Sequence, residues 1–253
     1  MKLNKLMFRE YDIRGIWNED ITEEISYYIG RAYATKLLSL KKNKMIVGYD
    51  NRLSSPIIEK NLVKGLTDGG VDVVRLGLVT TPMYYYAWDK LNIHCGIMIT
   101  ASHNPKEYNG FKMSYNGIHN CFGNEVAELY YIILNGIYSK GNGSITDANI
   151  KEDYIKMINS HINMGSNKLK VIYDCGNGTT SIVAKDIFVS NDNIEYIPLF
   201  AESDGTFPNH HPDPAVESNL TILKEKVKEL NADCGIAFDG DGDRVGVVNE
   251  KGE

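Results

Sequence analysis

Short, mostly apolar runs alternate along this chain with longer segments in which apolar residues recur every three or four positions. The first pattern is typical of strands, and the second of helices that cover a sheet. In the first half, the predicted strands are 45–49, 71–77 and 95–100, and the predicted helices are 22–40, 55–70 and 124–136. In the second half, the strands are 169–174, 194–200 and 234–238, and the helices are 153–162, 176–188 and 217–230. This alternation predicts mainly parallel sheets.

Residues 139–149, SKGNGSITDAN, separate the two halves. This stretch is polar, contains glycine and has no periodicity, as is typical of a connection between domains. We therefore expect two domains, 1–145 and 146–253. The predicted fold class is α/β, with two similar domains that each hold a mixed, mainly parallel sheet between helices. Ser55, which precedes Pro56, is predicted to be the N-cap of the helix that follows.

A weak internal repeat relates the two halves. MIVGYD at 45–50 resembles KVIYD at 170–174, and CGIMITASHNP from Cys95 parallels CGIAFDGDGDR from Cys234. In each half a strand therefore ends in a polar loop. Ligands of open parallel sheets bind beyond the carboxyl ends of the strands, so the repeat predicts that these two loops carry the chemistry.

Composition and charge exclude several classes of protein. The 253 residues are 43% hydrophobic and 24% charged, as in ordinary globular domains, and the formal net charge is −6 without a lysine or arginine block. We therefore expect no nucleic-acid or membrane partner. The sequence shows no signal-peptide pattern and no apolar run of spanning length, which predicts a water-soluble, cytoplasmic protein. The four cysteines form no C-x-x-C pair and are expected to be reduced and mostly buried.

The loop FDGDGDR contains three aspartates at alternate positions, Asp239, Asp241 and Asp243. Glycines between them allow the backbone to fold tightly enough for the carboxylates to converge, and a cation is then needed to offset their repulsion. A solvated acidic turn is the simpler alternative, but the apolar segments on both sides place the loop between strands. We therefore predict a site for a hard cation, with Mg²⁺ favoured because three carboxylates leave room for phosphate or water ligands.

An EF-hand loop is the main competing interpretation, because Glu250 is twelfth from Asp239. That loop requires glycine at its sixth position, where this chain has Arg244, and it lies between helices. The EF-hand is therefore rejected. Arg244 is predicted either to bind a phosphate or to form an ordinary salt bridge within the acidic loop.

The loop TASHNP contains Ser102, which alone would be interpreted as a helix cap or a turn residue. Its neighbours favour a functional role. His103 and Asn104 supply hydrogen-bonding groups, and the segment YNGFK that follows returns Lys112 toward the loop. A phosphorylated Ser102 would present oxygens to both a metal ion and cationic side chains.

Other polar residues have more than one interpretation. Arg14, in FREYDIRG, is as compatible with a solvated surface position as with a phosphate contact. His210 and His211 could ligate a metal, but adjacent side chains project apart, so a structured loop is favoured. The three consecutive tyrosines from Tyr84 are expected to lie on a partly buried helix.

Four motifs together resemble the α-D-phosphohexomutase superfamily, the phosphomannomutase and phosphoglucomutase group. In chain order they are FREYDIRG, TASHNPKEYNGFK, GTFPNHHPDP and DGDGDR. The resemblance implies a phosphoserine enzyme that interconverts hexose 1-phosphates and hexose 6-phosphates through a hexose 1,6-bisphosphate.

Site roles follow from this resemblance position by position. Ser102 corresponds to the phosphoryl carrier, which also completes the magnesium site formed by Asp239, Asp241 and Asp243. The remaining residues implied for the active site are Arg14, Lys112 and Arg244 as cations, with Lys112 or His103 transferring protons.

Proteins of this superfamily have four domains, whereas this chain resembles only the first two. The sugar-recognition domain and the C-terminal phosphate-binding domain are expected to be missing, so the fragment is predicted to have little mutase activity alone. The alternative is a non-catalytic module that binds magnesium or a sugar phosphate. A phosphatase is disfavoured because it would need an aspartate nucleophile at the strand end, where Ser102 stands.

Overall fold

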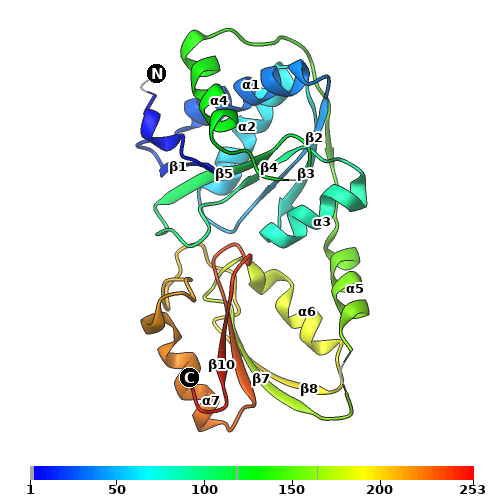
Figure 1. The fold of residues 1–253 in the computed structure, drawn as a ribbon, viewed down its shortest axis with the longest axis vertical. Helices are drawn as coiled ribbons and strands as arrows, with labels where there is room; N and C mark the ends of the chain where they lie inside the picture. The colour runs from blue at the N-terminus through cyan, green and yellow to red at the C-terminus, as the bar shows by residue number, and fades with distance from the viewer. Residues whose placement is uncertain (1–2, 118, 164) are drawn as a thin grey trace.

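The computed structural model describes residues 3–117, 119–163 and 165–253 as two α/β units, one above the other in Figure 1. The first unit comprises η1 (Lys5–Met7), β1 (Ile13–Ile16), α1 (Glu23–Ser39), β2 (Lys44–Tyr49), α2 (Ser55–Asp68), β3 (Asp72–Leu78), α3 (Thr81–Leu91), β4 (Gly96–Ile99), β5 (Tyr108–Ser114), α4 (Asn124–Asn135) and β6 (Ile145–Asp147). The second unit comprises α5 (Lys151–His161), β7 (Leu169–Asp174), η2 (Thr179–Ile182), α6 (Ala184–Val189), β8 (Ile194–Leu199), η3 (Glu217–Leu220), α7 (Thr221–Glu229), β9 (Cys234–Phe238) and β10 (Val245–Asn249).

The sheet of the first unit has the order β1-β5-β4-β2-β3-β6. Strands β4, β2, β3 and β6 are parallel, while β5 is antiparallel to both of its neighbours. Alternate residues of a strand face opposite sides of the sheet. In β2, Met45 and Val47 therefore pack with α1, α2 and α4, whereas Ile46 packs with α3.

The second sheet has the order β10-β9-β7-β8, with β7 parallel to both neighbours and β10 antiparallel to β9. Helix α7 covers one face through Leu223 and Val227. Phe188 of α6 stacks on Tyr173 on the other face, with ring centroids 4.6 Å apart. The predicted fold class, two α/β units with mixed, mainly parallel sheets between helices, is confirmed.

Helix α5 links the cores of the two units. Tyr154 of α5 and Val183, which precedes α6, are buried in the same apolar cluster as Met83 of α3. The two units therefore share a packed interface beside the polar contacts of the site described below.

Each predicted strand is present within one residue of its expected ends. The helix starts were less accurate. Ser54, not Ser55, is the N-cap of α2, and the Ser55 hydroxyl instead donates to Asp50 Oδ1 at 2.7 Å. The single helix predicted at 176–188 is a 3₁₀ turn followed by the short α6, and the stretch 139–149 contains β6, which pairs with β3.

The cysteines and the tyrosine run also agree with expectation. All four cysteines are free, and Cys95, Cys121 and Cys175 are buried. Burial raises the pKa of Cys175 to about 12. The tyrosine run from Tyr84 lies within α3.

Among the helices of the described segments, none has the length and apolar content needed to cross a membrane.

Helices α1 and α2 cross at two glycines. A Cβ added at Gly65 would lie 2.1 Å from the carbonyl oxygen of Tyr27, and one added at Gly30 would lie 2.3 Å from that of Leu62. Gly65→Ala should therefore lower the free energy of unfolding by about 2 kcal/mol, because the helices must move apart. Urea unfolding measures this change. Gly165→Ala, where a Cβ would meet nothing within 4 Å, is the control, and equal stability of the two variants would contradict the close packing.

The loop 204–214 is fixed to the end of β7 by His210. Its Nε2 lies 3.0 and 3.2 Å from the carboxylate oxygens of Asp174, and its Nδ1 lies 2.9 Å from the carbonyl oxygen of His211. Two acceptors favour an imidazolium, which can donate from both nitrogens. Burial lowers the pKa of His210, but the hydrogen bonds to Asp174 and His211 outweigh burial and raise the pKa above its ordinary value.

This raised pKa gives a pH-dependent contribution to stability. The contribution is complete below the unfolded-state pKa, near 6.5, and disappears as the pH rises through the folded-state pKa. His210→Gln should therefore cost about 2 kcal/mol at pH 6 and less at higher pH. Urea unfolding at several pH values tests this, with His161→Gln on the exposed end of α5 as control. A cost independent of pH would show that the pKa of His210 is the same in the folded and unfolded chain, and would contradict the ion pair with Asp174.

Candidate active site

The loops that follow β4 and β9 meet where the two units approach each other, near the middle of Figure 1. Ser102 lies in the first loop and Asp239 in the second. The Ser102 hydroxyl donates to Asp239 Oδ2 at 2.8 Å, across 137 positions of sequence. The two loops related by the internal repeat thus form a single site.

Ser102 has a constrained backbone. Its φ of 52° lies in the left-handed region, which costs roughly 1–3 kcal/mol for a residue other than glycine. Its N–H donates to Thr100 Oγ1 at 2.8 Å, and its carbonyl oxygen accepts from Arg52 Nη2 at 2.9 Å. These bonds hold the buried side chain toward the acidic loop, and His103 Nδ1 lies 3.4 Å from Ser102 Oγ.

Three carboxylates converge beside Ser102. One oxygen from each of Asp239, Asp241 and Asp243 lies within 4.8 Å of the others, and the first two side chains are buried. Burial, and then the charges of Asp241 and Asp243, raise the pKa of Asp239. Asp241 Oδ1 is buried without a hydrogen-bond partner among the described residues. A buried, unpartnered oxygen within a carboxylate cluster is suited to a hard cation such as Mg²⁺.

The other oxygen of Asp241 is saturated. Oδ2 accepts from Lys112 Nζ at 2.8 Å, Thr81 Oγ1 at 2.7 Å and Thr100 Oγ1 at 3.1 Å. Burial would raise the pKa of Asp241, but Lys112 and these hydrogen bonds lower it. Lys112 Nζ also donates to Asp243 Oδ2 at 2.6 Å. Burial alone would lower the pKa of Lys112, but the two carboxylates raise it.

Two arginines add positive charge to the site. Arg14, on β1, pairs with Asp12 and donates to Asn104 Oδ1, and its buried Nε has no partner in the described part of the chain. Arg244 is 47% exposed, and its Nε lies 4.0 Å from Asp239 Oδ2 and 3.9 Å from Asp243 Oδ1. Arg244 therefore remains available to an anion in solution.

Every candidate residue from the sequence thus lies at this site: Arg14, Ser102, His103, Lys112, Asp239, Asp241, Asp243 and Arg244. The sequence analysis missed Thr81, Thr100 and Arg52. Thr81 follows the α3 N-cap, Thr80, and nothing in the local sequence relates it to Asp241. His210 and His211 lie outside the carboxylate cluster, and His210 instead binds Asp174.

Comparison with protein families identifies both units of the chain. The family model described as phosphoglucomutase/phosphomannomutase, alpha/beta/alpha domain I, matches residues 5–136, and that of domain II matches residues 152–252. The chain belongs to this family. The resemblance inferred from the four motifs, including its restriction to the first two domains, is confirmed.

Individual relatives show the same correspondence. The chain is 46% identical over 247 residues to a phosphomannomutase/phosphoglucomutase of Pseudomonas syringae pv. tomato, covering 97% of this chain and 52% of that protein. A phosphoglucomutase of Neisseria meningitidis serogroup B is 40% identical over 248 residues, with 97% and 53% coverage. The crystal structure of a phosphoglucomutase/phosphomannomutase family protein from Burkholderia thailandensis gives a TM-score of 0.94 at 36% identity, covering all of this chain and 56% of that one. The chain spans about half the length of the curated relatives it matches.

The carboxylate cluster predicts that Mg²⁺ stabilises the folded chain. At 100 times the dissociation constant, the free energy of unfolding should rise by about 2.7 kcal/mol. Asp239→Asn should lower the affinity roughly tenfold or more, because it removes one anionic ligand. Isothermal titration and thermal unfolding with added Mg²⁺ measure both effects. Asp192→Asn, in an exposed turn before β8, is the control, and unchanged affinity in Asp239→Asn would contradict the assigned ligands.

Proposed function

We propose that this chain carries the phosphoserine and magnesium half of a phosphohexomutase. The observation that best supports this proposal is the 2.8 Å hydrogen bond from Ser102 Oγ to Asp239 Oδ2, which lies within a cluster of three carboxylates. A hydroxyl positioned beside a hard-cation site and several cations suits phosphoryl transfer, which depends on alignment and charge stabilisation. The substrates proposed are hexose 1-phosphates and hexose 6-phosphates, as the names of the relatives suggest.

The proposed reaction consists of two phosphoryl transfers, the first from Ser102 to the sugar and the second from the sugar back to Ser102. Phosphorylated Ser102 gives its phosphoryl group to the free hydroxyl of the hexose phosphate; the bond between phosphorus and Oγ breaks, the hydroxyl loses its proton and Oγ gains one. This forms a hexose 1,6-bisphosphate. The bisphosphate turns over, the Ser102 hydroxyl loses its proton as Oγ attacks the other phosphorus, and the bond from that phosphorus to the sugar oxygen breaks. That oxygen takes a proton, and the isomeric monophosphate leaves.

The surrounding residues have distinct proposed roles. When bound by Asp239, Asp241, Asp243 and the phosphoserine at Ser102, Mg²⁺ would supply positive charge beside the transferring oxygens. The cationic side chains of Arg14 and Arg244 would bind phosphate oxygens. Lys112 and His103 are the proposed proton carriers; His103 Nδ1 is 3.4 Å from Ser102 Oγ.

Complete turnover is proposed to need more than these two units. The relatives that bear the mutase names are about twice as long as the matched region, which covers 52–53% of them. We expect the chain alone to accept a phosphoryl group at Ser102 but to interconvert hexose phosphates little. A coupled assay measures this interconversion. Substantial isomerisation by the chain alone would contradict the proposal that turnover needs more than these two units.

Phosphorylation of Ser102 tests the proposal directly. The chain is incubated with glucose 1,6-bisphosphate and Mg²⁺, and its intact mass and peptide map are measured. One phosphate should be gained, confined to Ser102 and lost in Ser102→Ala; Ser160→Ala, on the exposed end of α5, should gain it normally. If Mg²⁺ binds but Ser102 stays unmodified, the non-catalytic binding module becomes the better description.

A further inference from the structure

The largest fully buried side chain in the described part of the protein belongs to Arg52, in the turn between β2 and α2. A buried guanidinium is costly unless it is paired and all its donors are satisfied. Arg52 contacts none of the three carboxylates of the candidate active site. The hydrogen bonds of Arg52 therefore indicate its role in the structure.

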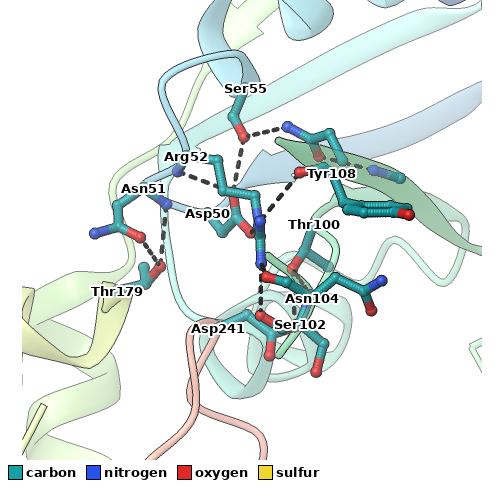
Figure 2. Close-up of polar contacts among 12 residues, drawn as sticks. Asp50, Asn51, Arg52, Ser55, Thr100, Ser102, Asn104, Tyr108, Thr179 and Asp241 are labelled. Carbon is teal, nitrogen blue, oxygen red and sulfur yellow. Dashed lines mark hydrogen bonds and ion pairs between the residues drawn. The ribbon is translucent and has the colours of Figure 1, made fainter. Parts of the chain in front are cut away.

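All five N–H donors of Arg52 have an acceptor, as Figure 2 shows in part. Nε donates to Asp50 Oδ2 at 3.1 Å. Nη2 donates to the carbonyl oxygens of Ser102 at 2.9 Å and Asn104 at 2.7 Å. Nη1 donates to those of Pro105 at 2.7 Å and Tyr108 at 3.0 Å. Four of the five acceptors thus lie in residues 102–108, the Ser102 loop, whose last residue also begins β5.

The guanidinium is itself fixed by Asp50. Asp50 Oδ1 accepts from the Arg52 N–H at 3.1 Å and from the Ser55 hydroxyl at 2.7 Å. Ser55 in turn accepts from Asn109 Nδ2, which follows the same loop. Because the donors of a guanidinium lie in one rigid plane, Arg52 sets the relative positions of four loop carbonyls.

The adjacent residue, Asn51, contacts the second unit. Its N–H donates to Thr179 Oγ1 at 3.1 Å, and its Nδ2 donates to the carbonyl oxygen of Asn177 at 2.7 Å. The Thr179 N–H donates at 2.9 Å to the carbonyl oxygen of Gly240, inside the acidic loop. Phe207 of the second unit also lies against Arg52, with its ring centroid 5.5 Å from Cζ.

We propose that Arg52 is the positioning residue of the phosphoryl carrier: through four loop carbonyls, and with Asn51 bound to the second unit, it aligns Ser102 with the acidic loop. This inference rests on the proposed function of Ser102. Arg52 makes no hydrogen bond to the three carboxylates, so it acts through the backbone of residues 102–108. Charge alone cannot perform this role, because a lysine would retain the charge but lose the planar set of five donors.

Arg52→Lys separates geometry from charge. We expect the rate of Ser102 phosphorylation at saturating glucose 1,6-bisphosphate to fall roughly 100-fold, as for a displaced reacting group. The bisphosphate concentration that gives half the maximal rate, and the affinity for Mg²⁺, should stay within about threefold because no ligand contact is lost. Arg75→Lys is the matched control, since Arg75 forms an exposed pair with Asp147.

Amide hydrogen exchange supplies a second readout that needs no catalysis. In Arg52→Lys, the amides of Ser102, Asn104 and Tyr108 should exchange roughly tenfold faster, while those of α1 are unchanged. Unchanged exchange in this loop, or phosphorylation at the unaltered rate, would overturn the positioning role. Absence of phosphorylation in the unaltered chain would instead count against the proposed function, and the exchange result would still decide the role of Arg52.

If Arg52→Lys does not fold, a milder variant still tests the proposed alignment. Asn51→Ala removes the side-chain contacts to Asn177, Thr179 and Ser203 but no donor to the Ser102 loop. We expect Ser102 phosphorylation to slow roughly tenfold while loop exchange stays normal, because only alignment between the units is loosened. An unaltered rate would contradict the proposed alignment by this segment.

Discussion

The close approach of two backbones, at Ser102 and Gly240, is the constraint on which the site depends. A Cβ at Gly240 would lie 2.6 Å from the Ser102 carbonyl oxygen, so only glycine lets the two loops come near enough for the Ser102 hydroxyl to reach Asp239. The acidic loop is held there by both units: Thr81 donates its N–H to the Asp241 carbonyl oxygen, and Thr179 donates to that of Gly240. The position of the acidic loop therefore depends on contacts from both units.

Three carboxylates persist in this small volume because each has a different environment. Asp239 Oδ1 accepts the backbone N–H groups of Asp243 and Arg244, at 3.0 and 3.1 Å. Asp241 is neutralised by Lys112 from the first unit. Asp243 lies toward solvent, where its charge costs least. The repulsion that the sequence implied is thus reduced by partners from both units, and one oxygen, Asp241 Oδ1, remains available.

The sequence predicted six of the ten strands in the described residues, β2, β3, β4, β7, β8 and β9, because their signals are local. Apolar runs define β2, β4 and β9, and the spacing DGDGD is readable within five residues. It could not predict contacts between distant segments: Thr81 and Asp241 are 160 positions apart, and Arg52 and Ser102 are 50 apart. It also missed β6, whose three residues carry no periodic pattern and form a strand only because β3 offers a free edge.

The two oxygens of Asp241 indicate how Lys112 and a cation share one cluster. Oδ2 is occupied by Lys112 and two threonine hydroxyls, whereas Oδ1 is free among the described residues. A cation bound at Oδ1 need not displace the Lys112 ammonium from Oδ2. Both cations, however, are attracted by the single negative charge of the Asp241 carboxylate. Each must therefore weaken the binding of the other, and to an equal degree, since coupling between two bound charges is reciprocal. The phosphate proposed for Ser102 would add negative charge beside Asp239 and so offset this competition.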